Sequence, residues 1–231
     1  MSKTIRYARP DGQSVDAFLA EPANPAGAPG LVVIQEWWGL NDQIRGVAER
    51  YAQAGYRALV PDLYRGKSTV EAAEAEHLMN GLDFGAAAGQ DIRGAVQHLK
   101  ATGSAKVGVT GYCMGGALTV LSSVFVPEAD AAVIWYGYPP LEFVDAKQIR
   151  IPLQGHWATE DPFFVIAGVD ALEGRLREAG VAFDFHRYAC QHAFANETQV
   201  EPHRHPACLY DPTAAAQAWD RTLAFFGQHL R

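Results

Sequence analysis

The residue in this sequence best placed to do chemistry is Cys113, in the stretch VTGYCMGGA. An apolar, strand-like run ends at this cysteine, and a run with helical spacing follows it. A reactive residue at such a junction sits on a sharp turn, where the residues two positions before and after it come very close together. Gly111 and Gly115 occupy those positions. The start of a helix also favours the thiolate form of a cysteine, so Cys113 is a candidate nucleophile.

Two interpretations fit the pattern G-x-C-x-G-G at positions 111–116. It matches the nucleophile elbow G-x-S-x-G, with a thiol in place of the hydroxyl. A buried structural cysteine beside a glycine-rich turn would show the same residues. Because the local pattern fits both, the choice depends on whether an acid and a base stand where a nucleophile needs them.

The acid and the base of an elbow enzyme follow later strands, in the chain order nucleophile, acid, base. In IPLQGHWATEDPFF, Asp161 comes just after a predicted strand and before a proline, and this fixed turn favours it over Glu160. In FHRYACQHAFAN, His192 comes just after the last predicted strand, with a solvated loop histidine as the alternative. His186 falls within that strand and is expected to be packed or exposed there. The residue types, their order and their shared sheet edge predict a triad of Cys113, His192 and Asp161.

A fourth candidate, Glu36, ends the strand-like run LVVIQE and is followed by two tryptophans. In such folds the loop after this strand supplies one backbone N–H to the oxyanion hole, and the residue after the nucleophile supplies the other. Trp37 and Met114 are therefore the candidate donors. A carboxylate in apolar surroundings has a raised pKa or a charged partner. Glu36 is a candidate proton acceptor for the Cys113 thiol, and a salt-bridged structural acid is the alternative.

The rest of the chain supplies the elements that must position these residues. Predicted strands cover 4–8, 15–22, 30–37, 56–64, 105–113, 131–139, 150–157 and 181–188, and predicted helices cover 41–55, 70–81, 85–102, 114–126, 163–180 and 212–230. Continuous apolar strands separated by amphipathic helices predict an α/β fold, with a mostly parallel sheet and helices on both faces. Ligands bind at the carboxyl ends of such strands, where the candidate residues lie. The longest irregular loop is 191–211, and long loops in compact domains are often functional.

Length, charge and cysteine usage limit the class of protein. The 231 residues show no linker, repeat or low-complexity tract, so we predict one domain spanning residues 1–231. A formal net charge of -7 argues against nucleic-acid binding, which needs a basic face. No apolar run approaches the ~20 residues needed to span a bilayer, and no secretory signal is visible at the start of the sequence. Three cysteines without framework spacing favour a reduced, cytoplasmic setting.

With these residues in place, the sequence resembles the dienelactone hydrolase (carboxymethylenebutenolidase) family of the α/β-hydrolase superfamily over nearly its whole length. The resemblance rests on QEWWGLN, PDLYRG, GYCMGGA, ATEDPFF, QHAFAN and AAQAWDRTLAFF. It implies a hydrolase of lactones or carboxylic esters in which Cys113 attacks the carbonyl and Glu36 receives the thiol proton. His192, oriented by Asp161, shuttles the proton, and water then hydrolyses a thioester. The resemblance implies a small-molecule ester or lactone substrate and neither a metal nor an organic cofactor.

One departure from that family concerns substrate binding. Dienelactone-cleaving members place an arginine four residues after the catalytic histidine to hold the substrate carboxylate, and here that position is Asn196. Arg65, in PDLYRG, is a candidate for a second anion contact, with a plain surface charge as the alternative. Aromatic residues near the expected site suit an apolar acyl group, although such residues are more often core. They are Trp37, Trp38, Tyr112, Phe163, Phe164 and Phe194.

Other functions fit parts of the pattern. A catalytically silent member of the fold would bind a small molecule, although all four candidate site residues are present. A thiol redox protein would pair Cys113 with Cys190 or Cys208, but the chain has no C-x-x-C motif. His203, His205 and Cys208 have a spacing that a metal site uses, without an obvious fourth ligand. Among hydrolases, a thioesterase or broad carboxylesterase would use the same machinery as a lactonase, and the sequence indicates no oligomeric state.

Overall fold

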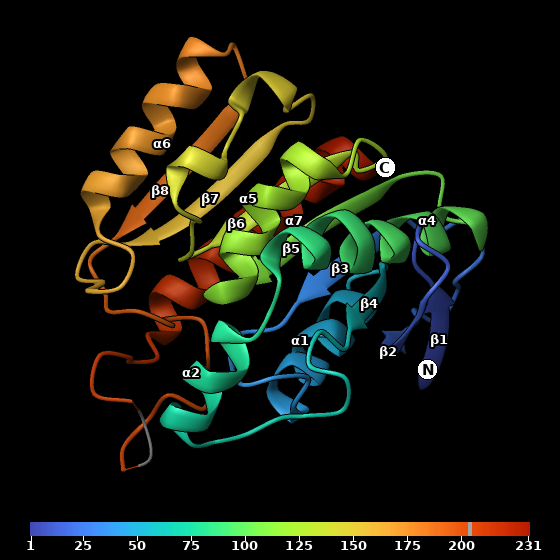
Figure 1. The fold of residues 1–231 in the computed structure, drawn as a ribbon, viewed down its shortest axis with the longest axis horizontal. Helices are drawn as coiled ribbons and strands as arrows, with labels where there is room; N and C mark the ends of the chain where they lie inside the picture. Colours follow the sequence, from blue (N-terminus) through green and yellow to red (C-terminus); the bar gives the residue numbers. More distant parts are fainter. Residues whose placement is uncertain (203–204) are drawn as a thin grey trace.

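A computed structural model of the chain describes residues 1–202 and 205–231. Its centre is an eight-stranded sheet in the order β1-β2-β4-β3-β5-β6-β7-β8 (Figure 1). The strands are β1 (Ser2–Ala8), β2 (Ser14–Ala20), β3 (Gly30–Ile34), β4 (Arg57–Pro61), β5 (Val107–Tyr112), β6 (Ala131–Trp135), β7 (Leu153–Ala158) and β8 (Phe183–Tyr188). Each predicted strand is present, and most are a few residues shorter than the apolar run that predicted them.

The sheet is mostly parallel, as predicted. β1 and β2 form an antiparallel hairpin, β2 pairs antiparallel with β4, and all other neighbouring strands are parallel. The strand order reverses between β3 and β5, because later strands are added outward from β5 while β4 and the hairpin lie beyond β3. Open α/β sheets bind ligands in the crevice at such a reversal, at the carboxyl ends of the strands. The ends of β3 and β5 are therefore the expected place for a site.

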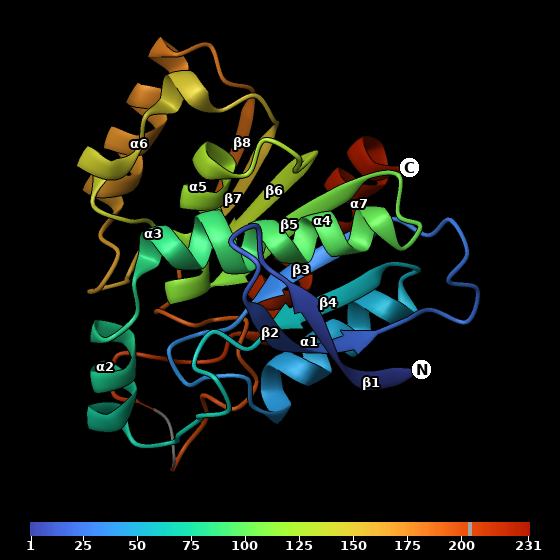
Figure 2. The same cartoon turned by 45° about the vertical axis from the view of Figure 1, so that its right-hand side comes forward.

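Helices cover both faces of this sheet (Figures 1 and 2). They are α1 (Asp42–Gln53), α2 (Ala72–Asn80), α3 (Phe84–Ala86), α4 (Arg93–Ala101), α5 (Met114–Phe125), α6 (Ile166–Glu178) and α7 (Pro212–Leu230). α1 and α7 pack on one face, and α4, α5 and α6 pack on the other. Because apolar side chains are buried on both sides, the central strands read as continuous apolar runs. Within the described residues, no helix combines the length and apolar character that crossing a membrane requires.

One end of the sheet carries the irregular segments. α2 lies away from both faces, beside the long segment that follows β8, at the carboxyl edge of the parallel strands (Figures 1 and 2). The helix predicted over 85–102 is divided into α3, a π-helical stretch (Ala87–Ile92) and α4. π-Helical turns within helices often occur at functional sites. The helix predicted from Phe163 begins instead at Ile166, because the residues before it form a turn around Asp161.

A buried histidine connects the strands β7 and β8 with the helix α7. His156 in β7 is fully buried, and its ring nitrogens lie 2.9 Å from the hydroxyl of Tyr188 in β8 and 2.9 Å from that of Thr222 in α7. Burial lowers the pKa of His156 well below its usual value, and the neighbouring His186 and Arg221 add to this effect. His156 is therefore held as a neutral ring that ties β7, β8 and α7 together.

Candidate active site

Cys113 lies between β5 and α5 with a backbone conformation that few residues adopt. Its φ is 56° and its ψ is -117°, in a region that costs free energy and is found mostly at functional turns. The turn brings its neighbours so close that a Cβ on Gly111 would overlap the backbone of Gly115. A Cβ on Gly115 would lie 2.5 Å from the carbonyl oxygen of Ile34 in β3. The junction therefore has the geometry of a nucleophile elbow, and both positions require glycine.

A third close approach, at Gly137, was not predicted from the sequence. A Cβ on Gly137 would overlap the carbonyl oxygen of Cys113, and the Cys113 N–H donates to the carbonyl of Trp135 at 3.0 Å. A Cβ on Gly116 would lie 2.5 Å from that same carbonyl oxygen of Trp135. The end of β6 thus packs directly against the elbow. The available signal was the glycine that follows the buried run AAVIWY.

His192 and Asp161 meet at the ends of the neighbouring strands β7 and β8. His192 Nδ1 lies 2.6 Å from Asp161 Oδ2, and both side chains are almost completely buried. The other oxygen of Asp161 accepts hydrogen bonds from the backbone N–H groups of Phe163 at 2.8 Å and Phe164 at 3.0 Å. The alternative acid, Glu160, is exposed. Asp161 is therefore the carboxylate that fixes the orientation of the His192 ring.

The charge of His192 depends on its two partners. Burial lowers its pKa, but the negative charge of Cys113 and the hydrogen bonds with Asp161 and Cys113 outweigh burial and raise the pKa to about 10. The imidazolium form of His192 is thus favoured at neutral pH. Aromatic rings pack against it: the ring centroids of Tyr136 and Phe163 each lie 5.2 Å from that of His192.

Glu36 lies two residues beyond the end of β3 and is 4% exposed. Asn196 Nδ2 donates to its Oε2 at 2.7 Å, and the Tyr136 hydroxyl donates to its Oε1 at 3.2 Å. Burial raises the pKa of Glu36, while the charge of His192 and the two hydrogen bonds oppose that rise. Tyr136 was not predicted as a site residue, and its φ of 35° is unusual for a bulky side chain. A buried acid with a raised pKa and neutral partners is suited to accept a proton.

The two candidate oxyanion donors flank the cysteine. Met114 is the first residue of α5, where backbone N–H groups have no acceptor within the helix. Trp37 directly follows Glu36, at the end of the adjacent strand β3. Both residues line the same cavity as Cys113. The positive end of the α5 dipole also points at the cysteine, which favours an anion there.

This cavity has a volume of about 130 Å³. Its lining consists of Trp37, Met79, Cys113, Met114, Phe163, Phe164, His192 and Cys208. Apart from the cysteine–histidine pair, the lining side chains are apolar. Met79 of α2 and Cys208 of the long segment after β8 were not predicted as cavity residues, because no local pattern relates them to the elbow. The cavity can hold a small apolar group against the nucleophile.

Comparison with known proteins agrees with this arrangement. A model of the dienelactone hydrolase family matches residues 15–230. The chain belongs to the dienelactone hydrolase family. Two similar proteins are Protein usf of Aquifex pyrophilus, 34% identical over 240 residues, and a protein of Aquifex aeolicus (strain VF5) named "Putative carboxymethylenebutenolidase", 29% identical over 241 residues. Each alignment covers 100% of both chains.

A solved structure supports the fold independently. The dienelactone hydrolase-like promiscuous phosphotriesterase P91, from metagenomic libraries, superposes with a TM-score of 0.88 at 22% identity. The match covers 100% of this chain and 99% of that one. The α/β-hydrolase fold predicted from the sequence is thus confirmed, and membership of the dienelactone hydrolase family makes the chain a hydrolase.

Some of the aromatic residues predicted to bind substrate line cavities, and others lie in the core. Phe163 lines the cavity beside Cys113, whereas Trp38 lines a larger neighbouring groove of about 380 Å³. Tyr112 and Phe194 are 4% and 0% exposed and pack in the core against Trp135. Neither residue lines the cavity beside Cys113, and their contact with substrate stays a prediction. Tyr112 ends a strand on the side away from the cavity, and Phe194 is turned inward by the tight turn after the last strand.

The two polar residues considered for anion binding have other partners. Arg65 binds Asp91 and lies outside the cavity that Cys113 lines. Asn196 is 1% exposed and holds Glu36, and its Oδ1 accepts from the Thr198 side chain at 2.7 Å. In this member of the dienelactone hydrolase family, neither residue lines the cavity beside Cys113.

The alternative chemistries fit the structure less well. Among the described residues, no group of histidine, cysteine and acidic side chains is arranged to hold a metal ion. His203 lies outside the described residues, so the proposed set with His205 and Cys208 is not placed. Cys190 is buried, and burial with nearby acids raises the pKa of its thiol to about 12, which makes it a poor redox partner. His186 lies within β8, half-buried beside Asp184.

Proposed function

We propose that this chain hydrolyses carboxylic esters or lactones through a thioester on Cys113. The observation that carries the proposal is the 2.6 Å contact between Asp161 and His192, with His192 lining one cavity with Cys113, which lies on a strained elbow. A nucleophile, a base and an orienting acid in this order are what acyl transfer requires.

In the first step of acylation, Glu36 accepts the thiol proton of Cys113, and the resulting thiolate lies beside the imidazolium of His192. The sulfur of Cys113 attacks the carbonyl carbon, and the electron pair of the C=O bond moves to oxygen. The backbone N–H groups of Trp37 and Met114 stabilise this oxyanion. The oxyanion then reforms the C=O bond and expels the alkoxide, which takes the proton of His192. The products are the free alcohol and a thioester, or one ring-opened thioester when the substrate is a lactone.

Deacylation reverses the roles of the same groups. Neutral His192, oriented by Asp161, removes a proton from water as the water oxygen attacks the thioester carbonyl. Collapse of the second oxyanion breaks the C–S bond, releases the carboxylic acid and restores the thiolate. Glu36 then returns its proton to the thiolate and can accept it again in the next turnover, a role that the raised pKa of this buried acid favours.

The acyl group is neutral and apolar in this proposal. Outside the reacting pair, the cavity is lined by aromatic, methionine and cysteine side chains. Arg65 is paired with Asp91, and Asn196 is committed to Glu36. A substrate carboxylate in this cavity would lose its hydration without gaining a charged partner, which is costly.

The cellular setting follows from the thiol chemistry. A thiolate nucleophile survives best in a reducing compartment, and none of the three cysteines forms a disulfide, so we place the enzyme in the cytoplasm. The mechanism calls for a small-molecule substrate and for no cofactor, nucleic acid or membrane. We treat residues 1–231 as one catalytic domain.

A matched pair of activated esters tests the proposal. 4-Nitrophenyl butyrate and 4-nitrophenyl hemisuccinate share a leaving group and differ in a carboxylate on the acyl group. We expect kcat/KM to be at least about tenfold higher for the butyrate, because a buried, unpaired carboxylate is unfavourable. Cys113→Ala should abolish hydrolysis, and Cys190→Ala, the control, should retain it. Wild-type activity in Cys113→Ala would contradict the proposed nucleophile, and preference for the hemisuccinate would contradict the proposed acyl group.

A further inference from the structure

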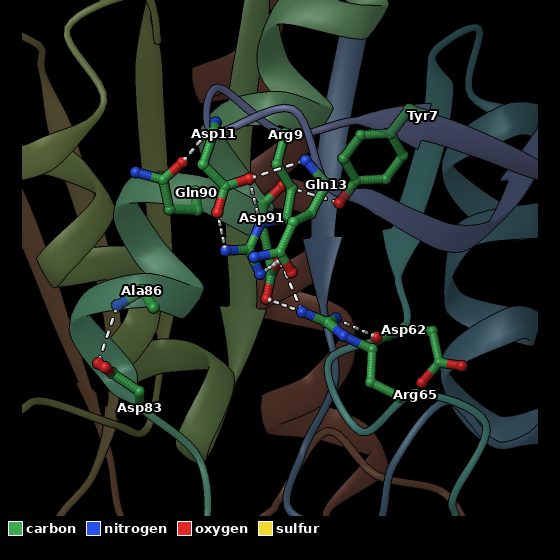
Figure 3. A network of polar contacts seen from close by, with 10 residues as sticks. All are labelled: Tyr7, Arg9, Asp11, Gln13, Asp62, Arg65, Asp83, Ala86, Gln90 and Asp91. Carbon is green, nitrogen blue, oxygen red and sulfur yellow. Dashed lines mark hydrogen bonds and ion pairs between the residues drawn. The ribbon is translucent and has the colours of Figure 1, made fainter.

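Arg65 combines an exposed position with a buried partner. Its φ of 56° lies in the left-handed region, which residues other than glycine, asparagine and aspartate rarely adopt. Its Nη2 lies 2.9 Å from each carboxylate oxygen of Asp91, and its Nη1 donates to the carbonyl of Asp62 at 2.8 Å. The Asp91 side chain is 3% exposed. Arg65 thus reaches inward to a buried acid (Figure 3).

Asp91 is itself fixed from the opposite side. It lies in the π-helical stretch Ala87–Ile92, between Arg65 and Arg9 (Figure 3). Arg9 Nη1 donates to Asp91 Oδ1 at 3.1 Å, and the Tyr7 hydroxyl donates to the Asp91 carbonyl at 2.8 Å. Burial raises the pKa of Asp91, and both arginines oppose that rise. The hairpin β1–β2 therefore holds Asp91 in place, and Asp91 holds Arg65.

The segment that carries Arg65 supports the loop of the first oxyanion donor. We call residues 62–69 the β4–α2 loop. Ser68 pairs with Gly39 in an isolated antiparallel bridge, and the N–H of Thr69 donates to the carbonyl of Trp38 at 3.0 Å. A Cβ on Gly39 would lie 2.9 Å from the Ser68 Cα, so the two segments are in close contact. The residue just before Trp38 is the candidate donor Trp37.

The same loop reaches the second donor. The hydroxyl of Tyr64 donates to the sulfur of Met114 at 3.2 Å, and Tyr64 is 6% exposed. Met114 begins α5 directly after Cys113. The β4–α2 loop is therefore in contact with both sides of the candidate oxyanion hole, while its own shape depends on a left-handed residue that an ion pair holds.

We propose that the Arg65–Asp91 ion pair positions the oxyanion hole through the β4–α2 loop. Arg65 is a positioning residue: it lies outside the cavity that Cys113 lines, and it acts by fixing the loop against Trp38 and Met114. This inference rests on the proposed function, because an oxyanion hole matters only for acyl transfer. Oxyanion contacts strengthen as the tetrahedral intermediate forms, so a displaced donor lowers kcat and leaves KM nearly unchanged.

An ion pair outside this network supplies the control. Arg65→Gln removes the ion pair on the loop side of Asp91, and Arg187→Gln removes the ion pairs of another partly exposed arginine, in β8, with acids of α6. With 4-nitrophenyl butyrate, we expect Arg65→Gln to lower kcat about tenfold or more at unchanged KM, since small displacements of catalytic donors have large effects. Arg65→Lys should be intermediate, because an ammonium pairs with Asp91 but cannot keep the fork geometry. Arg187→Gln, the control, should lower the melting temperature and leave kcat unchanged.

Three results would overturn this inference. One is an unchanged kcat in Arg65→Gln, and another is an equal loss of kcat in Arg187→Gln. The third is an Arg65→Gln effect that raises KM for the hemisuccinate ester and changes nothing else, which would make Arg65 an anion ligand instead. Failure of the proposed function has a different signature, because wild type would then show no hydrolysis that depends on Cys113. If Arg65→Gln does not fold, Arg65→Lys carries the same comparison.

Discussion

At the scale of single residues, Glu36 and Asp161 differ in the donors that surround them. Asp161 accepts from two backbone N–H groups and contacts His192 at 2.6 Å, so its negative charge is strongly supported. Glu36 accepts from neutral donors, Asn196 and Tyr136, and burial raises its pKa. Two carboxylates thus have different surroundings, which fits the different roles of the proposed mechanism: Asp161 orients a ring, and Glu36 takes a proton.

The role of Glu36 can be separated from that of the triad. Glu36→Gln keeps the size of the side chain but removes its basicity, so we expect acylation to slow by about 10²-fold and deacylation to remain normal. Stopped-flow bursts with 4-nitrophenyl butyrate measure the two steps. Tyr136→Phe is the control, because it removes one hydrogen bond to Glu36 and keeps the carboxylate. A normal burst rate in Glu36→Gln would make Glu36 a structural acid.

The thiols should differ in reactivity. Cys113 is half-buried at the start of α5 and lines a cavity with His192, whereas Cys190 is buried and burial raises the pKa of its thiol to about 12. With limiting iodoacetamide at neutral pH, we expect the Cys113 peptide to be alkylated first. Peptide mapping measures this, and faster labelling of Cys190 would show that the elbow does not activate its cysteine.

At the scale of elements, the elbow depends on how closely β6 and α5 approach the turn. A Cβ on Gly137 would overlap the carbonyl oxygen of Cys113, and this oxygen also accepts the first hydrogen bonds of α5. The turn therefore has little freedom to move. Substitutions at Gly137 should act on stability and on catalysis together, because the same backbone atoms serve both.

A pair of glycine substitutions tests this packing. Gly137→Ala should destabilise the fold by about 1–3 kcal/mol, as overpacking does, and should lower kcat. Gly174, in α6, has open space where its Cβ would lie. Gly174→Ala should therefore stabilise by about 0.4–1 kcal/mol and leave kcat unchanged. Urea unfolding and steady-state kinetics measure both variants, and equal effects of the two substitutions would contradict the close packing at the elbow.

The bounds of a helix or strand could be predicted where a single periodic pattern runs through the whole element. α7 has the predicted bounds, because Asp211 caps it and Pro212 fits its first turn. The break in the helix predicted over 85–102 was not predictable, because the π-helical stretch depends on Asp91 being held by Arg9 and Arg65, far away in sequence. Local propensity carries no information about such contacts.

At the scale of the whole molecule, a neutral buried histidine makes stability depend on pH. The pKa of folded His156 is lowered well below 6.5, while the unfolded chain has an ordinary histidine. Below about pH 6.5 the unfolded state therefore binds one more proton than the folded state, and stability falls as pH falls. For one proton the slope is at most about 1.4 kcal/mol per pH unit.

Unfolding measurements across this pH range isolate the effect. We expect the free energy of unfolding to decrease between pH 7 and pH 5 more steeply in wild type than in His156→Gln. The difference in slope should approach one proton. His77→Gln, at an exposed position of α2, should keep the wild-type slope. Identical slopes in wild type and His156→Gln would mean that His156 is protonated in the folded state.

The positions of the site residues could be predicted where the strand topology determines them. The carboxyl ends of parallel strands meet at one edge, so the order of Cys113, Asp161 and His192 predicts their meeting from the sequence alone. No such rule predicts that Tyr136, Met79 and Cys208 lie at the site, because side-chain direction and loop packing bring them there. For the same reason, Tyr112 and Phe194 lie near the site in sequence but point into the core.

The central claim is that Cys113 carries the acyl group. The most direct measurement is to mix the enzyme with 4-nitrophenyl acetate, quench with acid during turnover and map the peptides by mass spectrometry. We expect the peptide containing Cys113 to gain one acetyl group that neutral hydroxylamine removes, as it does a thioester. The His192→Gln variant should show less of this adduct, because its thiolate lacks a partner. Rapid ester hydrolysis with no adduct on Cys113, or an adduct on Cys190 or Cys208 instead, would contradict the account.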